Sequence, residues 1–169
     1  FTLQRYGQMN KYKIWDLDGT VIDSSHRYST LANGDIDLPK WIADNTRANI
    51  EQDKLLPLAR LMKSNYRQGD IVIICTARVL GIWDHVFLAD NGIKAHFILS
   101  RAKGDNRGDA EMKKAKLIAL FADLKIPFAR WTRNATFYDD NKNVIEMAKK
   151  IGISTKDAVQ LNFKLTNKA

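Results

Sequence analysis

The sequence has little of several features that would assign a chain to a class at once. It contains one cysteine, Cys75, in 169 residues, so no disulfide can form within the chain. No apolar run approaches the ~18 residues of a membrane span, and we expect no membrane partner. The N-terminus lacks a basic segment followed by an apolar one, so we expect no secretory signal. These absences predict a cytoplasmic protein, and the apolar run 71–75 predicts a buried Cys75 thiol rather than a redox site.

Acidic residues are outnumbered by basic ones. The 27 Lys and Arg residues against 19 Asp and Glu residues give a net charge of +8. Such a surplus suits a polyanionic partner, nucleic acid first, and is equally typical of a protein that is simply soluble. Basic residues recur over 101–107, 113–116 and 149–150, which favours a basic face over a basic tail. The composition carries no signal for the oligomeric state.

Short apolar runs alternate with helical patterns along most of the chain. The runs, which we interpret as buried strands, cover 12–15, 71–75, 95–99, 135–138 and 158–163. The helical patterns lie between them, at 55–62, 82–88, 117–124 and 144–151. This alternation predicts an α/β fold: a Rossmann-like three-layer sandwich with a central parallel sheet. We expect one domain over 12–169 and interpret residues 1–11 as an extension or upstream remnant, since Met9 is a possible start.

The stretch from Val21 to Asp53 departs from this alternation. It contains a helical pattern from about Trp41 to Ile50, and Pro39 is acceptable near a helix start. We interpret it as a small helical flap or cap beside the site, where it would exclude water and select substrates. Peripheral packing is the alternative. Trp41 is likewise either a core residue or a platform on which a base stacks.

Two aspartates, Asp16 and Asp18, directly follow the first predicted strand. Side chains alternate along a strand, so these carboxylates point the same way just past its end. A pair so placed can bind one hard cation such as Mg2+, or divide the roles of nucleophile and proton carrier. The same pattern is also typical of an acidic turn in a loop.

Three later segments carry further polar groups to strand ends. Thr76 follows the second strand, where a hydroxyl and free backbone N–H groups suit a phosphate or simply cap a helix. Asp139 and Asp140 follow the fourth strand and suit a divalent cation, although Asp140 is also a good helix cap. Lys113 and Lys116 lie three residues apart on one helical face, from which either could reach the site or point into solvent.

Taken in order, these segments resemble the haloacid dehalogenase superfamily of phosphotransferases. The resemblance rests on Asp16-Leu17-Asp18-Gly19-Thr20, Thr76, the lysine at 113 or 116, and Asp139-Asp140, and it spans roughly residues 12–159. A narrower resemblance is to the 3′-phosphatase domain of phage polynucleotide kinase. It is carried by Arg101-x-x-Gly104-Asp105-x-Arg107-x-Asp109-x-x-x-Lys113 and by residues 139–147. The P-loop of the kinase domain does not occur, so kinase activity is not implied.

The resemblance implies a mechanism and a set of site residues. Asp16 would be the nucleophile that forms an aspartyl-phosphate, and Asp18 the general acid and base. Thr76 and Lys113, with Lys116 as fallback, would offset the charge of the phosphoryl group. Mg2+ would be bound by Asp16, the Asp18 carbonyl and Asp139, with Asp140 as a possible replacement. The remaining candidates would contact the substrate, and they are Gly19, Thr20, Ala77, Arg78, Arg101 and Arg107.

We therefore expect a Mg2+-dependent phosphomonoester hydrolase. By resemblance and by charge, its first-choice substrates are the 3′-phosphate ends of nucleic acid. The alternative is a nucleotidase acting on free mononucleotides, which would use the same catalytic residues. A phage origin is suggested only by the kinase resemblance.

Overall fold

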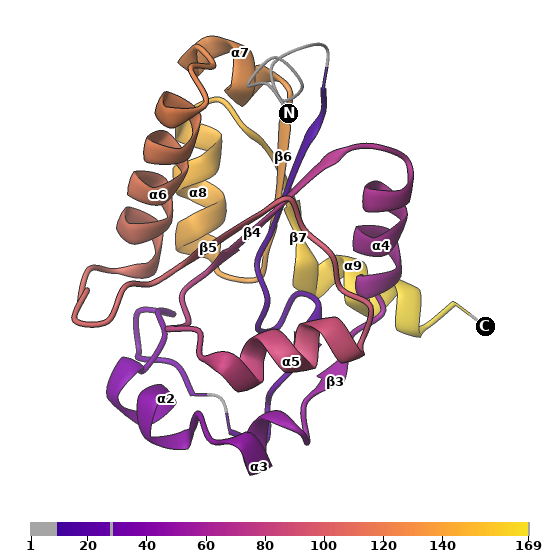
Figure 1. Ribbon diagram of the computed structural model, residues 1–169, viewed down its shortest axis with the longest axis vertical. Helices are drawn as coiled ribbons and strands as arrows, with labels where there is room; N and C mark the ends of the chain where they lie inside the picture. Colours follow the sequence, from indigo (N-terminus) through magenta and orange to yellow (C-terminus); the bar gives the residue numbers. More distant parts are fainter. Residues whose placement is uncertain (1–9, 28, 169) are drawn as a thin grey trace.

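Five strands pair in parallel through the centre of the computed structural model, which describes residues 10–27 and 29–168 (Figure 1). They are β1 (Tyr12–Trp15), β4 (Ile71–Thr76), β5 (Phe97–Ser100), β6 (Ala135–Asp139) and β7 (Ser154–Asp157). Their order across the sheet is β5-β4-β1-β6-β7. The central strand β1 lies between β4 and β6, with Ile14 level with Ile73 on one side and with Phe137 on the other. The register therefore aligns the carboxyl ends of these three strands.

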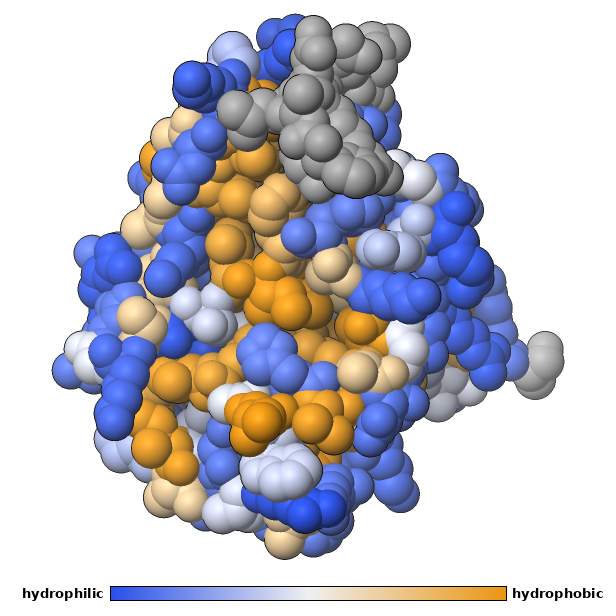
Figure 2. All heavy atoms as spheres, in the orientation of Figure 1, coloured by the Kyte–Doolittle hydropathy of each residue, from blue (hydrophilic) through white to orange (hydrophobic). Residues whose placement is uncertain are grey.

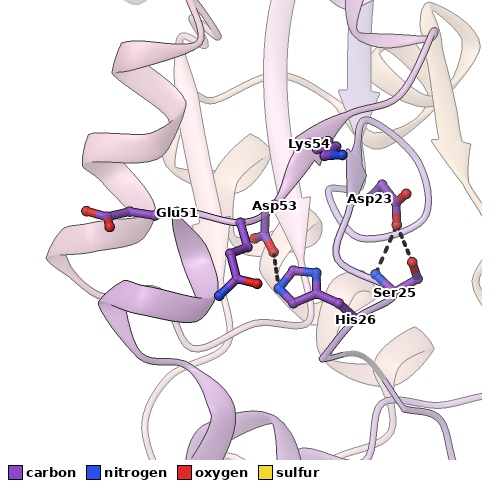
Figure 3. Close-up of a pocket in the computed structure, with 7 residues that line it drawn as sticks. Asp23, Ser25, His26, Glu51, Asp53 and Lys54 are labelled. Atoms are coloured by element: carbon purple, nitrogen blue, oxygen red, sulfur yellow. Dashed lines mark hydrogen bonds and ion pairs between the residues drawn. The ribbon is translucent and has the colours of Figure 1, made fainter.

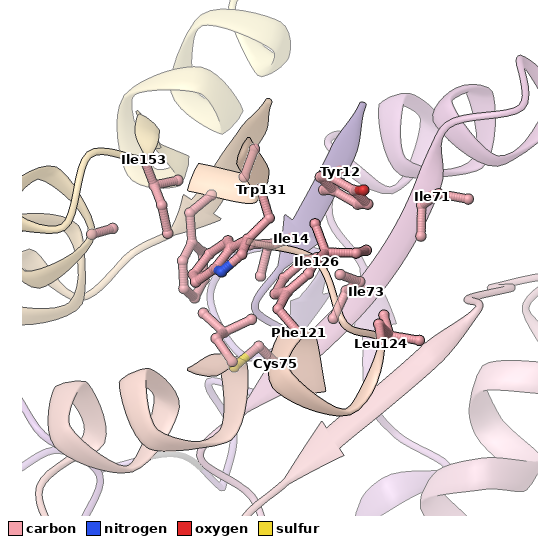
Figure 4. Packing of buried hydrophobic residues seen from close by; sticks show 14 of the residues in the cluster. Tyr12, Ile14, Ile71, Ile73, Cys75, Phe121, Leu124, Ile126, Trp131 and Ile153 are labelled. Carbon is pink, nitrogen blue, oxygen red and sulfur yellow. The ribbon is translucent and has the colours of Figure 1, made fainter. Parts of the chain in front are cut away.

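Both faces of the sheet are buried because successive side chains point to opposite sides. On one face Tyr12 and Ile14 join a cluster that contains Phe121 and Trp131, whose rings stack at 4.3 Å between centroids (Figure 4). Cys75 belongs to this cluster and is fully buried, as predicted, and burial raises the pKa of its thiol to about 12. On the other face Trp15 stacks on the Tyr138 ring.

Helices cover each face, so the predicted three-layer α/β sandwich is confirmed. The first face packs against α6 (Asp109–Asp123), α7 (Phe128–Arg133) and α8 (Lys142–Lys150). The second packs against α4 (Ala59–Arg67), α5 (Ile82–Asp90) and α9 (Ala158–Thr166). This leaves the carboxyl end of the sheet free for other segments.

Residues 24–53, called the insertion from here on, lie at that end. They leave and rejoin the fold through the antiparallel pair β2 (Ile22–Asp23) and β3 (Lys54–Leu55). They contain α2 (Leu38–Asp44) and α3 (Arg47–Ile50), drawn in purple beside α5 in Figure 1. The single helix expected over 41–50 is thus two helices, because Asn45 ends α2 and Thr46 caps α3 through a bond from the Asn49 N–H to its hydroxyl.

The strand expected at 158–163 is wrong. The Asp157 carboxylate accepts the N–H groups of Val159 and Gln160 and so starts helix α9 at Ala158. The true edge strand, β7, has the sequence Ser-Thr-Lys-Asp and no apolar run. The exposed Val159 and Phe163 show that the run does not mark a buried strand.

Figure 2 shows the surface that α5 and the edge strand β5 present to solvent. Apolar side chains gather there, and those exposed on α5 are Ile82, Trp83 and Val86. Among the described residues, no helix combines the length and the apolar character that crossing a bilayer requires. The extension predicted at 1–11 lies outside the described residues except for Asn10 and Lys11.

Candidate active site

A compact group of charged side chains lies at the carboxyl ends of β1 and β6. Asp16 follows β1 and Asp139 ends β6, the strand beside it. Lys113, on α6, reaches between them: its Nζ lies 2.9 Å from Asp16 Oδ1 and 2.7 Å from Asp139 Oδ2. All three are almost fully buried. Such charges are tolerated inside a protein only when paired, so the lysine and the two carboxylates form one unit.

Asp140 adds a third carboxylate to this unit. One oxygen from each of Asp16, Asp139 and Asp140 lies within 4.8 Å of the others, so the donor set fits a hard divalent cation. Burial and the neighbouring carboxylates raise the pKa of both Asp139 and Asp140. The crowding leaves negative charge that Lys113 alone does not balance. The Asp18 carboxylate is outside this group, so a metal ligand from Asp18 would have to be its backbone oxygen.

Gly19 makes room for Asp140. It has φ +73°, and a Cβ placed on it would lie 2.2 Å from Asp140 Oδ2. Any side chain would therefore both strain the backbone and displace the Asp140 carboxylate. Gly19 therefore allows the backbone to approach the Asp140 carboxylate closely, next to the predicted cation ligands.

Lys113 holds its charge despite its burial. Desolvation works to lower the pKa of the ammonium, but Asp139 and Asp16 outweigh it and raise the pKa well above the ordinary value. Lys116, the other candidate, is half-buried one turn further along α6 and makes no ion pair with these carboxylates. The geometry thus brings Lys113 to the site.

Asp18 faces a different set of partners from Asp16. The Ser24 hydroxyl donates to Asp18 Oδ1 at 2.7 Å, and Arg78 binds both carboxylate oxygens, through Nε at 2.7 Å and Nη2 at 2.5 Å. Burial works to raise the pKa of Asp18, but Arg78 and Ser24 outweigh it and lower the pKa. The two aspartates of the motif therefore lie in distinct environments, as two carboxylates with distinct roles require.

The threonines and Ala77 are buried within the site. Thr20 Oγ1 donates to Asp16 Oδ2 at 3.0 Å, so it orients the carboxylate. Thr76, at the end of β4, accepts the Arg78 N–H on its hydroxyl at 3.1 Å. Ala77 packs with Ile36 and Trp41 of the insertion.

The remaining arginines are not brought to the carboxylates of the site. Arg101 is buried and donates to the backbone carbonyls of Ala77, Asp105 and Arg107 and to the Asp109 carboxylate, so it holds its own loop together. Arg107 is exposed and pairs with Asp105 at 2.8 Å. Substrate contact by either one stays a prediction.

Other side chains complete the surroundings of Arg78, and sequence reasoning missed all of them except Trp41. The Trp41 ring, 1 % exposed, lies 4.8 Å from the Arg78 guanidinium and 4.3 Å from that of Arg27, so it is a core residue. Asp53 and Asp84 also bind Arg78. No motif marks these residues, because they reach Arg78 from two different parts of the chain.

With the geometry in place, the comparisons with known proteins identify the class. The parallel sheet, the Asp-x-Asp sequence after its central strand, the buried lysine and the acidic pair define a hydrolase of the haloacid dehalogenase superfamily, a phosphatase. Solved structures agree in fold: a haloacid dehalogenase-like hydrolase from Streptococcus pneumoniae matches with a TM-score of 0.62 and 12 % identity, over 90 % of each chain.

Within this superfamily, a sequence comparison identifies the family of the chain. A family model described as bacteriophage T5 5′-deoxynucleotidase matches residues 3–168, and the chain belongs to that family. The 5′-deoxynucleotidase of Escherichia phage T5 is 28 % identical over 179 residues, covering 94 % of this chain and 71 % of that protein.

A solved structure of an RNA repair complex also contains a chain of similar fold. A chain in the Pnkp1/Rnl/Hen1 RNA repair complex matches with a TM-score of 0.61 and 25 % identity. The match covers 89 % of this chain and 43 % of that one, so this chain spans less than half of its length.

Proposed function

We propose that this phosphatase hydrolyses nucleotide phosphomonoesters through an aspartyl-phosphate on Asp16. The observation that carries the proposal is the division of labour in the Asp-x-Asp motif. Asp16 lies against Lys113 and the acidic pair, where a phosphoryl group would be neutralised, whereas Asp18 lies against Ser24 and Arg78. One carboxylate is therefore available to attack phosphorus while the other carries the proton.

The reaction proceeds in two steps. In the first, Asp16 attacks phosphorus, the bond to the ester oxygen breaks, and that oxygen takes a proton from Asp18. The dianionic substrate favours proton uptake by Asp18, which offsets the lowering of its pKa by Arg78. In the second, Asp18 takes a proton from water, whose oxygen attacks phosphorus and releases Asp16 and inorganic phosphate. Lys113 stabilises the phosphoryl oxygens in both steps.

The acidic cluster supports a dependence on Mg2+. Asp16, Asp139 and Asp140 would hold the ion, together with the backbone oxygen of Asp18. When bound, Mg2+ neutralises charge between the attacking carboxylate and the phosphate. Three carboxylates lie around one lysine, so a divalent cation would balance charge that Lys113 leaves, which supports the assignment.

Free deoxynucleoside 5′-monophosphates are the substrates that we favour. Family membership over residues 3–168 supports this choice and reverses the order of preference drawn from charge and motif alone. The burial of Asp16 and Asp18, 4 % and 6 % exposed, also suits a small substrate enclosed beneath the insertion. The second candidate is a 3′-phosphate end of nucleic acid, which the likeness to a chain of the RNA repair complex supports.

Phosphate release measured with Mg2+ tests both substrate classes together. The panel contains deoxynucleoside 5′- and 3′-monophosphates and a 3′-phosphorylated oligonucleotide. We expect the 5′-monophosphates to be preferred, and Asp16→Asn to reduce release to background while the fold is retained by circular dichroism. Preference for the oligonucleotide, with steep salt dependence, would establish the second candidate. Near-normal activity of Asp16→Asn would refute the mechanism.

A further inference from the structure

Arg78 is enclosed by carboxylates on more than one side. It leaves the end of β4, and its side chain is 1 % exposed. Besides Asp18, its guanidinium binds Asp84 through Nη1 at 2.7 Å and Asp53 through Nη2 at 3.3 Å. Contacts on Nε, Nη1 and Nη2 leave the planar guanidinium no freedom to rotate.

These contacts belong to a closed ring of side chains. Asp53 is bound in turn by Arg27, through Nε at 3.0 Å and Nη2 at 2.6 Å. Asn45 then joins Arg27 to Asp84, accepting from the first at 3.0 Å and donating to the second at 3.1 Å. The members of this buried ring are Arg27, Asn45, Asp53, Arg78 and Asp84.

The charges of the buried ring balance without Asp18. Two guanidinium groups face two carboxylates, and the Trp41 ring lies against both guanidiniums. Arg78 therefore does not depend on Asp18 for its counter-charge. It can keep its position and hold the Asp18 carboxylate in one orientation through Nε and Nη2.

The outer side of Asp53 faces a hollow of about 450 Å³. Figure 3 shows this hollow, with His26 beside the Asp53 carboxylate at 3.5 Å. Its lining carries the carboxylates of Asp23, Glu51 and Asp53 against one lysine, Lys54, so it does not suit an anionic substrate. Asp53 thus acts inward, on the buried ring.

We infer that Asp53 and Asp84 are positioning residues for catalysis: they fix Arg78, and Arg78 orients the Asp18 carboxylate toward the leaving group. This inference rests on the proposed function. It also gives the insertion a part in the chemistry, because Arg27, Asn45 and Asp53 all belong to it while Asp18 does not.

A pair of aryl phosphates tests the inference without relying on the natural substrate. Phenyl phosphate and p-nitrophenyl phosphate have similar shapes, but the phenyl leaving oxygen is more basic and needs the proton from Asp18 more. For Asp53→Asn and Asp84→Asn we expect kcat/KM to fall about tenfold further on phenyl phosphate than on p-nitrophenyl phosphate, within the range of general acid catalysis. We expect Asp84→Glu, which keeps the charge, to recover part of the difference.

Matched controls separate positioning from folding. Asp90→Asn on α5 and Asp44→Asn in the insertion remove a carboxylate outside the buried ring and should leave both rates unchanged. Asn45→Ser breaks the ring at an uncharged member, so it should fold even if the aspartate variants do not, and we expect a loss of about threefold with the same leaving-group preference.

Three other outcomes would contradict the inference or the proposed function. Equal losses on both aryl phosphates, or no loss, would overturn the inference. A wild-type enzyme that hydrolyses aryl phosphates but no nucleotide would refute the proposed substrate and leave this test intact. A wild-type enzyme inactive on both classes would overturn the two together.

Discussion

The insertion touches the rest of the protein on two sides that differ in kind. On one side the buried ring joins it to Arg78 through the ion pair with Asp53 and to Asp84 through a hydrogen bond from Asn45. On the other, residues 33–36 meet the loop before α6 and the start of α8 through hydrogen bonds, most of them exposed or partly buried. We call this second contact the polar seam; its members are Asn33, Gly34, Asp35, Ile36, Gly108, Asp109, Asn141 and Asn143.

Five hydrogen bonds cross the polar seam among the described residues: two join neutral groups, and three have the Asp35 or Asp109 carboxylate as acceptor. Asn143 Nδ2 donates to the Asn33 carbonyl at 2.7 Å, and Asn141 Nδ2 to the Gly34 carbonyl at 3.3 Å. The strongest member is the Ile36 N–H, which donates to the buried Asp109 carboxylate at 2.9 Å. Water can replace most of these bonds, because four of the five are exposed or partly buried, whereas the guanidinium and carboxylate groups of the ring are buried. The seam should therefore open at low cost while the ring stays closed, and substrate should enter on the seam side.

Breaking the buried ring at Arg27 should have the largest effect. Arg27→Ala removes both bonds that Arg27 makes to Asp53 and leaves a buried carboxylate with much less compensation. We expect the free energy of unfolding, measured with urea, to fall by about 3 kcal/mol. Lys40→Ala removes a surface pair with Asp44 and is the control, expected to cost less than about 1 kcal/mol. Equal costs would show that the ring contributes no more than a surface pair.

Locking the seam is the second test. A Cβ on Gly108 would lie 3.0 Å from an Asp35 carboxylate oxygen, so side chains at these two positions meet across the seam and are candidates for a cross-link. We expect the double variant Asp35→Cys/Gly108→Cys, once oxidised, to lose at least about tenfold in activity and to regain it on reduction. Cys75 is buried and should not interfere. The single variants under the same oxidant are the controls, and full activity in the cross-linked protein would place the entry route elsewhere.

The sequence was most informative about the site residues that directly follow a predicted strand. Asp16 and Asp139 follow apolar strands, so alternation along one strand and the geometry of a parallel sheet were enough to bring them together. Helical spacing alone left Lys113 and Lys116 equivalent. Only the packing of α6 against the sheet buries Lys113 and leaves Lys116 half-buried.

The buried ring could not be predicted because its members are far apart in the sequence. Arg78 and Asp18 are 60 residues apart, and Arg27 and Asp53 are 26 apart, with no motif connecting them. As single residues, Asp53 and Asp84 are indistinguishable from ordinary surface aspartates. The edge strand β7 was not predicted because its four residues are polar or charged and show no apolar pattern. The neighbouring apolar run was predicted as the strand instead.

Weakening the seam at its edge should have the smallest effect. Asn143→Ala removes one exposed hydrogen bond to the Asn33 carbonyl, which water can then satisfy, so we expect the free energy of unfolding to fall by less than about 1 kcal/mol. The rate on p-nitrophenyl phosphate should stay within about twofold of wild type, because no member of the ring has moved. A cost close to that of Arg27→Ala would contradict the distinction between the two sides. It would mean that the insertion is held equally on both, and that substrate entry requires more than the opening of the polar seam.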